Sequence, residues 1–308
     1  MHIYFLGTGA GIPSKRRNVT SICLRLEPKL GQIWMFDCGE GTQHRVLESP
    51  IRLAKLTRVF ITHLHGDHLY GLPGLLSSRS FQAPDRPLCL YGPPGLERYL
   101  EVSLKSSGTH LTYPLQVVEL KNGQTLTVDG FTIHVQPLQH GLPCFGYRIE
   151  EPPRPGRLRH DKLEALNIPP GPVYKELKQG KTVTLPDGRA INGKEFVDPP
   201  IPGRVVALLG DTSPCSQADE LAAHADVLIH EATYDARDAA LAHMHQHSTN
   251  LDAARLAKRA RVKRLILTHL SSRYDERAEQ RLLEDARAIF PATELASDLS
   301  EFAVEFTH

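Results

Sequence analysis

The fold class that this sequence predicts is an α+β, αββα sandwich: two packed mixed β-sheets with helices on their outer faces, plus a protruding arm. Short apolar, β-rich runs recur along the chain, and each leads to a polar side chain. Helical stretches lie between these runs. One proline-rich segment breaks the pattern, and proline fits neither central strands nor helix interiors. The 308 residues are enough to bury a substantial core.

The apolar runs predict strands in chain order. Residues 1–6 pass directly into glycines, which fits a first strand better than a signal peptide. Four later runs lead to candidate ligands: 59–61 to His63, 131–135 to His140, 205–209 to Asp211, and 265–267 to His269. Because strand-end loops converge on one edge of a sheet, these side chains are expected to share a cleft. Helices are expected over residues 217–224 and 249–261.

The inserted arm is predicted over residues 151–203, within one domain that spans residues 1–308. This segment holds ten of the chain's 23 prolines. A turn signal at Asp187-Gly188 gives it local order, and aromatic residues such as Tyr174 and Phe196 indicate packing. A disordered linker between two domains is the alternative. The excess of basic over acidic residues in segment 151–203 is modest.

The composition excludes several classes of protein. A formal net charge of +1 argues against a polyanion binder that works through global charge, so any nucleic-acid contact must come from local patches. The five cysteines form no Cys-x-x-Cys pair, which is typical of buried thiols in a reducing compartment. No run approaches the roughly eighteen apolar residues of a membrane span. We expect a cytoplasmic protein with no membrane association.

Two glycine-rich stretches imitate nucleotide-binding loops without meeting their requirements. The glycines at positions 7, 9 and 11 fail the Gly-x-Gly-x-x-Gly spacing, because position 12 is Ile. Residues 188–194 resemble a phosphate-binding loop, but Glu195 replaces the required Ser or Thr. No nucleotide cofactor is therefore expected.

The most informative stretch lies directly after the run 59–61, where three imidazoles and a carboxylate occur within six positions. They are His63, His65, Asp67 and His68. Imidazole and carboxylate are ligands that Zn²⁺ accepts, and two ions with about four ligands each need further partners. The other strand-end residues, His140, Asp211 and His269, have the required chemistry, although a lone histidine is usually structural. The pattern predicts a dinuclear metal site in which Asp211 can bridge the ions.

These residues resemble the metallo-β-lactamase superfamily and, within it, the short-form ribonuclease Z family of tRNA 3′-processing endonucleases. The superfamily signature His-x-His-x-Asp-His occupies residues 63–68. Three narrower motifs match the family: Pro-x-Lys-x-Arg-Asn at 13–18, His-Glu-Ala-Thr at 230–233, and His-Ser-Thr at 247–249. The match covers nearly the whole chain without a departure at any motif position. It implies the metallo-β-lactamase fold.

The resemblance also implies an activity. The protein would be a zinc-dependent endoribonuclease that removes the 3′ trailer from precursor tRNA, leaving a tRNA 3′-hydroxyl, by attack of a metal-bridging hydroxide. Two Zn²⁺ per subunit are implied, and Mn²⁺ or a similar ion can substitute. Whether the cut falls after the discriminator base or after the CCA end stays open.

Roles for individual residues follow from the same resemblance. One ion would take His63, His65 and His140, and the other would take Asp67, His68 and His269, with Asp211 bridging. Asp67 would act as the general base. His247 would meet the developing oxyanion or protonate the leaving oxygen, with Glu231 orienting its imidazole.

The substrate side is assigned to basic and aromatic residues. Lys15 and Arg17 suit backbone phosphates, while Arg79 and Phe81 could add phosphate and stacking contacts. The arm, with Gly171-Pro172, would grip the body of the tRNA by shape. The resemblance further implies a homodimer in which one subunit's arm can serve the other's active site.

Two competing hypotheses remain. The same dinuclear centre could hydrolyse a small phosphodiester or ester, as related enzymes do. Alternatively, the chain could be an RNA-binding or scaffolding protein with a structural metal. Deletion of the arm separates the first alternative from the tRNA enzyme, and metal chelation tests the second.

Overall fold

The computed structural model describes residues 1–26 and 31–306, which form two compact units. The first unit contains residues 1–128, 132–149 and those from 205 onward, and the second contains Asp129–Phe131 and Glu150–Arg204. Within the described residues, no helix has the length and apolar character needed to cross a membrane.

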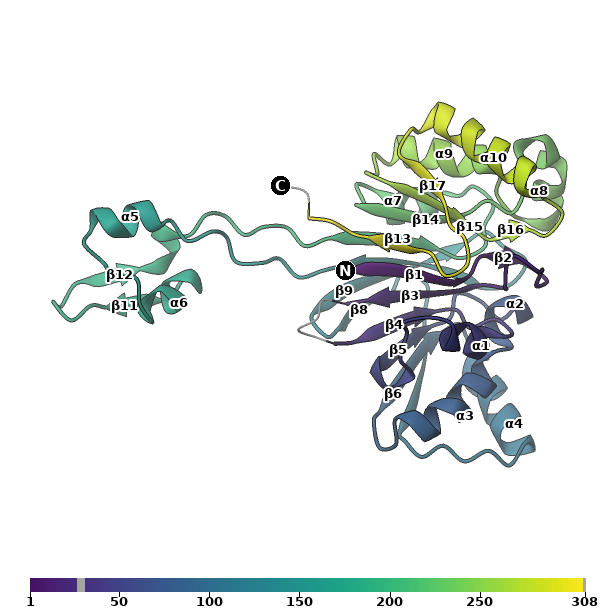
Figure 1. Cartoon of the computed structure of the whole chain (residues 1–308), viewed down its shortest axis with the longest axis horizontal. Coiled ribbons are helices and arrows are strands. Elements are labelled where there is room, and N and C mark those ends of the chain that lie inside the picture. The colour runs from purple at the N-terminus through teal and green to yellow at the C-terminus, as the bar shows by residue number, and fades with distance from the viewer. Residues whose placement is uncertain (27–30, 307–308) are drawn as a thin grey trace. The chain divides into compact units, whose positions relative to one another are not determined.

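Two seven-stranded sheets lie face to face in the described part of the first unit (Figure 1). The first sheet has the spatial order β18 (Glu301–Ala303), β1 (His2–Gly7), β3 (Ser21–Arg25), β4 (Ile33–Phe36), β5 (Leu56–Phe60), β6 (Leu88–Gly92) and β7 (Leu115–Glu119). The second has the order β17 (Thr293–Leu295), β15 (Leu265–Thr268), β14 (Val227–Glu231), β13 (Val205–Leu209), β10 (Cys144–Glu150), β9 (Phe131–Leu138) and β8 (Thr125–Val128). Antiparallel pairing in β18-β1-β3-β4 gives way to parallel pairing in β4-β5-β6-β7.

Helices cover the outer face of each sheet (Figure 1). On the first sheet lie α1 (Thr42–Leu47), α3 (Leu72–Gln82) and α4 (Leu96–Ser106). On the second lie α7 (Ser216–Ala222), α9 (Asn250–Arg259) and α10 (Glu276–Ile289). Shorter elements are η1 (Leu53–Lys55), α2 (Gly66–Leu69), η3 (Ala236–Asp238), α8 (Ala239–His245) and the parallel pair β2 (Gly9–Ala10) and β16 (Leu270–Ser271). The predicted αββα class is confirmed.

An aromatic layer joins the inner faces of the two sheets. Phe36 of β4 stacks on Phe60 of β5 with ring centroids 5.0 Å apart, and Tyr147 of β10 meets Phe60 edge-on at 5.5 Å. The Tyr147 hydroxyl donates to the Ile61 carbonyl at 2.6 Å. Because such pairs add to the energy of apolar burial, this layer fixes the loop after β5 against the second sheet.

The strands expected before His63, His140, Asp211 and His269 are confirmed as β5, β9, β13 and β15. The two predicted helices are also present, as α7 and α9. The side chain of Thr249 caps α9 by accepting from the Asp252 amide, and Asp252 completes a capping box.

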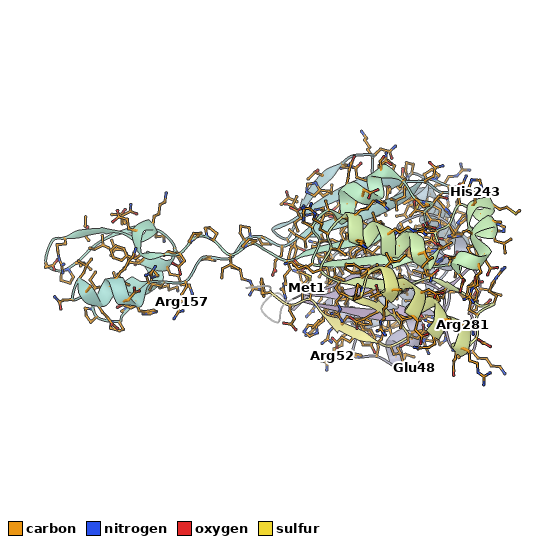
Figure 2. All side chains as sticks on the ribbon, turned by 90° about the horizontal axis from the view of Figure 1, so that it is seen from above. Met1, Glu48, Arg52, Arg157, His243 and Arg281 are labelled. Carbon is orange, nitrogen blue, oxygen red and sulfur yellow. The ribbon has the colours of Figure 1, made fainter. Side chains whose placement is uncertain are left out.

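The second unit has its own small core. It contains α5 (His160–Ala165), α6 (Val173–Lys178), η2 (Gly193–Phe196) and a hairpin of β11 (Thr182–Thr184) and β12 (Ala190–Asn192). Leu163 and Leu177 are completely buried in its apolar cluster, against which Tyr174 packs. Exposed basic side chains, including Arg157 (Figure 2), lie on this unit.

Candidate metal centre

Strand ends bring the candidate ligands together in the first unit. The loop and short helix α2 after β5 carry His63 to His68, while Asp211 and His269 directly follow β13 and β15. His269 has a left-handed backbone with φ 56°, which turns the chain between β15 and β16. Such a conformation costs energy in a non-glycine residue and persists only where its surroundings enforce it.

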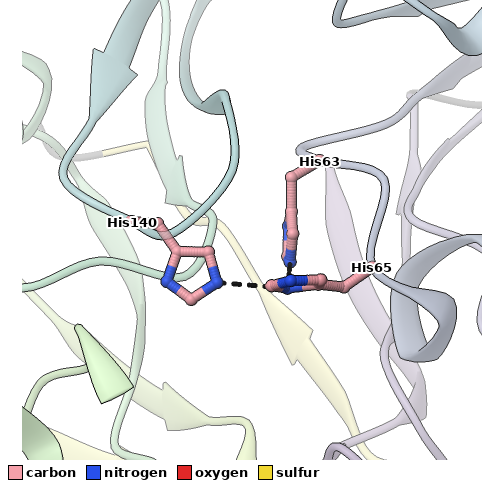
Figure 3. Close-up of side chains that lie close together, drawn as sticks. All are labelled: His63, His65 and His140. Atoms are coloured by element: carbon pink, nitrogen blue, oxygen red, sulfur yellow. Dashed lines mark hydrogen bonds between the residues drawn. The ribbon is translucent and has the colours of Figure 1, made fainter. Parts of the chain in front are cut away.

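Two triads of ligand atoms lie side by side. His65 Nδ1 is 3.0 Å from His63 Nε2 and 3.2 Å from His140 Nε2 (Figure 3). In the second triad, His269 Nε2 is 3.1 Å from His68 Nε2 and 3.3 Å from Asp67 Oδ2. A tetrahedral Zn²⁺ with ligands at about 2.0–2.1 Å sets ligand atoms roughly 3.3 Å apart. The spacing of both triads therefore fits one metal ion in each.

Asp211 lies between the triads. Its Oδ2 is 3.4 Å from His68 Nε2, 3.5 Å from His269 Nε2 and 3.7 Å from His63 Nε2. Burial raises the pKa of Asp211, but the surrounding imidazoles outweigh burial and hold the pKa well below its usual range. One buried carboxylate thus faces histidines of both groups, as a bridging ligand must.

A buried carboxylate, Asp37, orients two of the imidazoles. His68 Nδ1 donates to Asp37 Oδ2 at 2.7 Å, and the Thr62 hydroxyl donates to the same oxygen at 2.8 Å. Because that hydroxyl is the donor to Asp37, its oxygen accepts from His63 Nδ1 at 3.0 Å. With Nδ1 as the donor in each ring, the Nε2 atoms face the triads, which is how outer-shell carboxylates orient metal ligands.

Glu231 plays the same part on the opposite side. The Thr233 hydroxyl donates to Glu231 Oε2 at 2.5 Å and accepts from His269 Nδ1 at 2.8 Å. Glu231 Oε1 accepts from His247 Nδ1 at 2.9 Å. The Glu231 carboxylate is buried. It orients His269, a candidate metal ligand, through Thr233, and it orients His247, a candidate acid, directly.

The pKa of His247 is shifted in the opposite direction to that of His63. Burial lowers its pKa, but the Glu231 carboxylate outweighs burial and raises the pKa to about 9. By contrast, burial lowers the pKa of His63 well below its ordinary value. The cluster therefore combines a neutral imidazole suited to a metal with a protonated one suited to proton donation.

Of the basic and aromatic residues expected to contact RNA, two are buried and two are exposed. Arg17 is 7 % exposed and paired with Glu279, and Arg79 is completely buried with its guanidinium 4.3 Å from the centroid of the Tyr113 ring. This burial and pairing disfavours the phosphate contacts predicted for both arginines. Lys15 is exposed, and Phe81 is 88 % exposed.

Gly171 and Pro172 lie at the start of α6 in the second unit and are exposed.

The sequence interpretation missed Asp37, Thr62 and Thr233 as orienting residues. Asp37 directly follows the apolar strand β4, so the rule that identified Asp211 could have found it. Nothing comparable marks the two threonines, whose role depends on contacts made in the folded chain.

Comparison with solved structures defines the class. The chain aligns with the crystal structure of human tRNase Z, short form, at a TM-score of 0.71 and 30% identity, covering 99% of this chain and 100% of that one. The metallo-β-lactamase fold protein YhfI from Bacillus subtilis aligns at 0.69 and 19% identity, covering 98% of each chain. A family model described as anti-Pycsar protein Apyc1 matches residues 1–151.

Fold and site together define a metal-dependent hydrolase of the metallo-β-lactamase fold. Curated relatives narrow the class further. "Ribonuclease Z" of Geobacillus kaustophilus is 52% identical over 99% of both chains, and "Ribonuclease Z" of Bacillus licheniformis is 50% identical over 100% of both. This chain belongs to the ribonuclease Z family.

Proposed function

We propose that this protein is the endoribonuclease that removes the 3′ trailer from precursor tRNA and leaves a tRNA 3′-hydroxyl. The observation that carries the proposal is the pair of adjacent ligand triads, spaced for two metal ions, in a chain similar over its full length to ribonuclease Z and tRNase Z. Two Zn²⁺ per subunit are proposed, with Mn²⁺ or a similar ion as a substitute.

The proposed ligands follow the two triads. His63, His65 and His140 would hold one ion, and Asp67, His68 and His269 would hold the other, with Asp211 between them. When bound, such ions lower the pKa of a coordinated water and neutralise charge on phosphoryl oxygens.

The remaining roles belong to protein side chains that handle protons. Burial raises the pKa of Asp67, but the neighbouring His269 and His68 outweigh burial and hold the pKa below its usual range, so this carboxylate is ionised and can accept a hydrogen bond from an attacking water. His247, with a pKa of about 9, is protonated at neutral pH and suited to donate to the leaving oxygen. Glu231 keeps that imidazole oriented.

Substrate recognition is proposed for exposed groups in both units. Lys15 and Phe81 offer a phosphate contact and a stacking surface. The second unit, 150–204, is proposed as the tRNA-binding arm. Its exposed Gly171-Pro172 directly precedes α6. Lys178 and Lys194 line a pocket of about 640 Å³ in this unit, together with Asp198 and several prolines. Homodimer formation and a cytoplasmic location are part of the proposal.

The test is incubation of the purified protein with a labelled precursor tRNA carrying a 3′ trailer, with and without a chelator. We expect one cut that leaves a 3′-hydroxyl on the tRNA, loss of cutting with chelator, and recovery with added Zn²⁺ or Mn²⁺. Mapping the product ends gives the cleavage position. Cleavage that persists without metal would overturn the mechanism, and hydrolysis of a small phosphodiester alone would favour the alternative substrate class.

A further inference from the structure

Arg17 is largely buried within a polar network that also includes the exposed Arg16, whose Nη2 donates to Glu279 Oε1 at 3.0 Å. The Arg17 guanidinium forms a two-pronged ion pair with Glu279 of α10, with Nε 3.0 Å from Oε1 and Nη2 2.9 Å from Oε2. Its Nη1 donates to the Thr8 hydroxyl at 2.6 Å and to the Ala296 carbonyl at 2.7 Å. A guanidinium saturated in this way has little capacity to bind an incoming phosphate.

The network holds the glycine-rich loop between β1 and β3 against the carboxy-terminal half of the chain. Thr8, which Arg17 contacts, also donates from its hydroxyl to Asp298 Oδ1 at 2.7 Å. The Thr8 carbonyl accepts from the Leu270 amide at 3.0 Å, and Gly9 is paired with Leu270 in the β2-β16 ladder. Leu270 directly follows the candidate ligand His269.

The same loop also contacts Asp67, which belongs to the same ligand triad as His269. The Gly11 amide donates to Asp67 Oδ2 at 2.7 Å. Asp67 Oδ2 also lies 3.3 Å from His269 Nε2. One loop therefore contacts both Asp67 and the segment adjoining His269, although these residues are far apart in sequence.

We propose that Arg17 and Glu279 are a positioning pair that sets the geometry of Asp67 and His269 through the Gly11 amide and the β2-β16 ladder. This inference rests on the proposed metal-ligand roles of those two residues. It assigns Arg17, which the sequence suggested for RNA, to the support of the metal site. Lys15, exposed on the same loop, keeps the RNA-contact role.

Glu279→Gln separates the two interpretations because they predict different zinc retention. A positioning pair weakened by loss of the carboxylate charge should release zinc more readily to a competing chelator, by roughly tenfold or more. Turnover of a small chromogenic phosphodiester should fall with it. RNA binding does not decide between the interpretations, because the variant also frees the exposed Arg16, which pairs with Glu279 at 3.0 Å. If Arg17 served RNA instead, zinc retention would be unaltered. That result would overturn the proposal.

The matched control is Lys15→Ala on the same loop. It should flatten the salt dependence of RNA binding and leave zinc retention as in the unchanged protein. Zinc retention is read without any RNA, so it reports on the positioning pair even if the protein proves not to cut precursor tRNA. The two proposals can therefore fail separately.

A second pair of variants guards against a Glu279→Gln protein that does not fold. Gly11 and Gly123 have φ of +71° and +70°, and a methyl group added at either meets nothing within 4 Å. Alanine thus imposes the same backbone strain at both positions. Only Gly11→Ala should loosen zinc, by roughly tenfold as expected for disturbing a hydrogen bond to a charged group. Equal zinc retention in the two variants would overturn the proposal.

Discussion

At the scale of single residues, Asp37 controls the tautomers of two proposed ligands. Its carboxylate accepts from His68 Nδ1 and from the Thr62 hydroxyl, which in turn accepts from His63. Asp37 itself has φ 58°, a left-handed conformation that aspartate and asparagine tolerate better than most residues. The position therefore serves both the backbone turn after β4 and the chemistry of the site.

Asp37→Asn should weaken zinc binding without unfolding the protein. Asparagine keeps the left-handed backbone, but its amide group can present a donor to His68 Nδ1, which moves the imidazole proton to Nε2 and blocks the metal-facing atom. We expect a loss of metal affinity of about 10- to 100-fold, as for other outer-shell ligands. Competition with a chromogenic chelator measures it.

Asp85→Asn is the matched control, since Asp85 is exposed and has φ 62°. It should leave zinc affinity unchanged. If the two asparagine variants bound zinc equally well, Asp37 would have no orienting role.

Gly210 sets the position of Asp211 by close packing. A methyl group there would lie 2.6 Å from Cys144 Sγ and 2.8 Å from Thr62 Cβ. Gly210→Ala should therefore lower the free energy of unfolding by roughly 1–3 kcal/mol and reduce zinc retention, as measured by denaturant titration and chelator competition. Gly141→Ala, whose methyl group would have Gln246 Oε1 at 3.8 Å as its nearest neighbour, should do neither. Equal stability of the two variants would contradict the packing argument.

The basic loop illustrates the limit of sequence reasoning at this scale. Lys15 and Arg17 are two positions apart and carry the same charge, yet one is exposed and the other is paired with Glu279, 262 positions away. Charge and spacing along the chain cannot distinguish them. Their environments depend on where α10 packs, which is a property of the fold.

At the scale of elements, strand ends carry the proposed site. Apolar runs such as 205–209 are readable because a strand buried on both faces is continuously apolar, and a polar residue just after it must lie at the sheet edge. The candidate ligands could therefore be predicted together. The internal helices of the second unit could not, because proline clusters hide the short pattern around Leu163 and Leu177.

Glu151 and Arg204 form an ion pair at the two ends of the segment that makes up most of the second unit. Arg204 Nε donates to Glu151 Oε2 at 2.8 Å, and Nη2 donates to Oε1 at 2.9 Å. Burial raises the pKa of Glu151, but these contacts outweigh burial and lower the pKa below its ordinary value of 4.5. The carboxylate therefore stabilises the folded segment fully above pH 4.5, and this contribution declines as the pH falls through the lowered pKa.

Hydrogen exchange of residues 150–204 between neutral pH and pH 3 tests this. Protection should fall at the acid end, and Glu151→Gln should weaken protection at neutral pH and remove this part of the acid dependence. Asp187→Asn breaks a solvent-exposed pair with Arg189 in the same unit and should change little. An acid dependence that survives in Glu151→Gln would assign it to another group.

At the scale of the whole molecule, the proposed centre is confined to the first unit, although it draws on distant parts of the chain. Asp67 and His269 are 202 positions apart, and β1 pairs with β18 near the end of the chain. The first unit must therefore fold as one body before its ligands meet. The second unit leaves and re-enters at neighbouring strands β10 and β13, and the Glu151 amide donates to the Arg204 carbonyl at 2.9 Å.

That geometry allows the proposed arm to be removed cleanly. Replacing residues 152–203 with a short Gly-Ser linker should preserve the first unit, because the ends to be joined already share a backbone hydrogen bond. If the second unit grips the tRNA body through charge and shape, the KM for precursor tRNA should rise on the order of tenfold or more at physiological salt. Turnover of a small phosphodiester and zinc content should match those of the full chain. Unchanged cleavage of precursor tRNA would refute the arm assignment, and loss of zinc would mean that the first unit depends on the second.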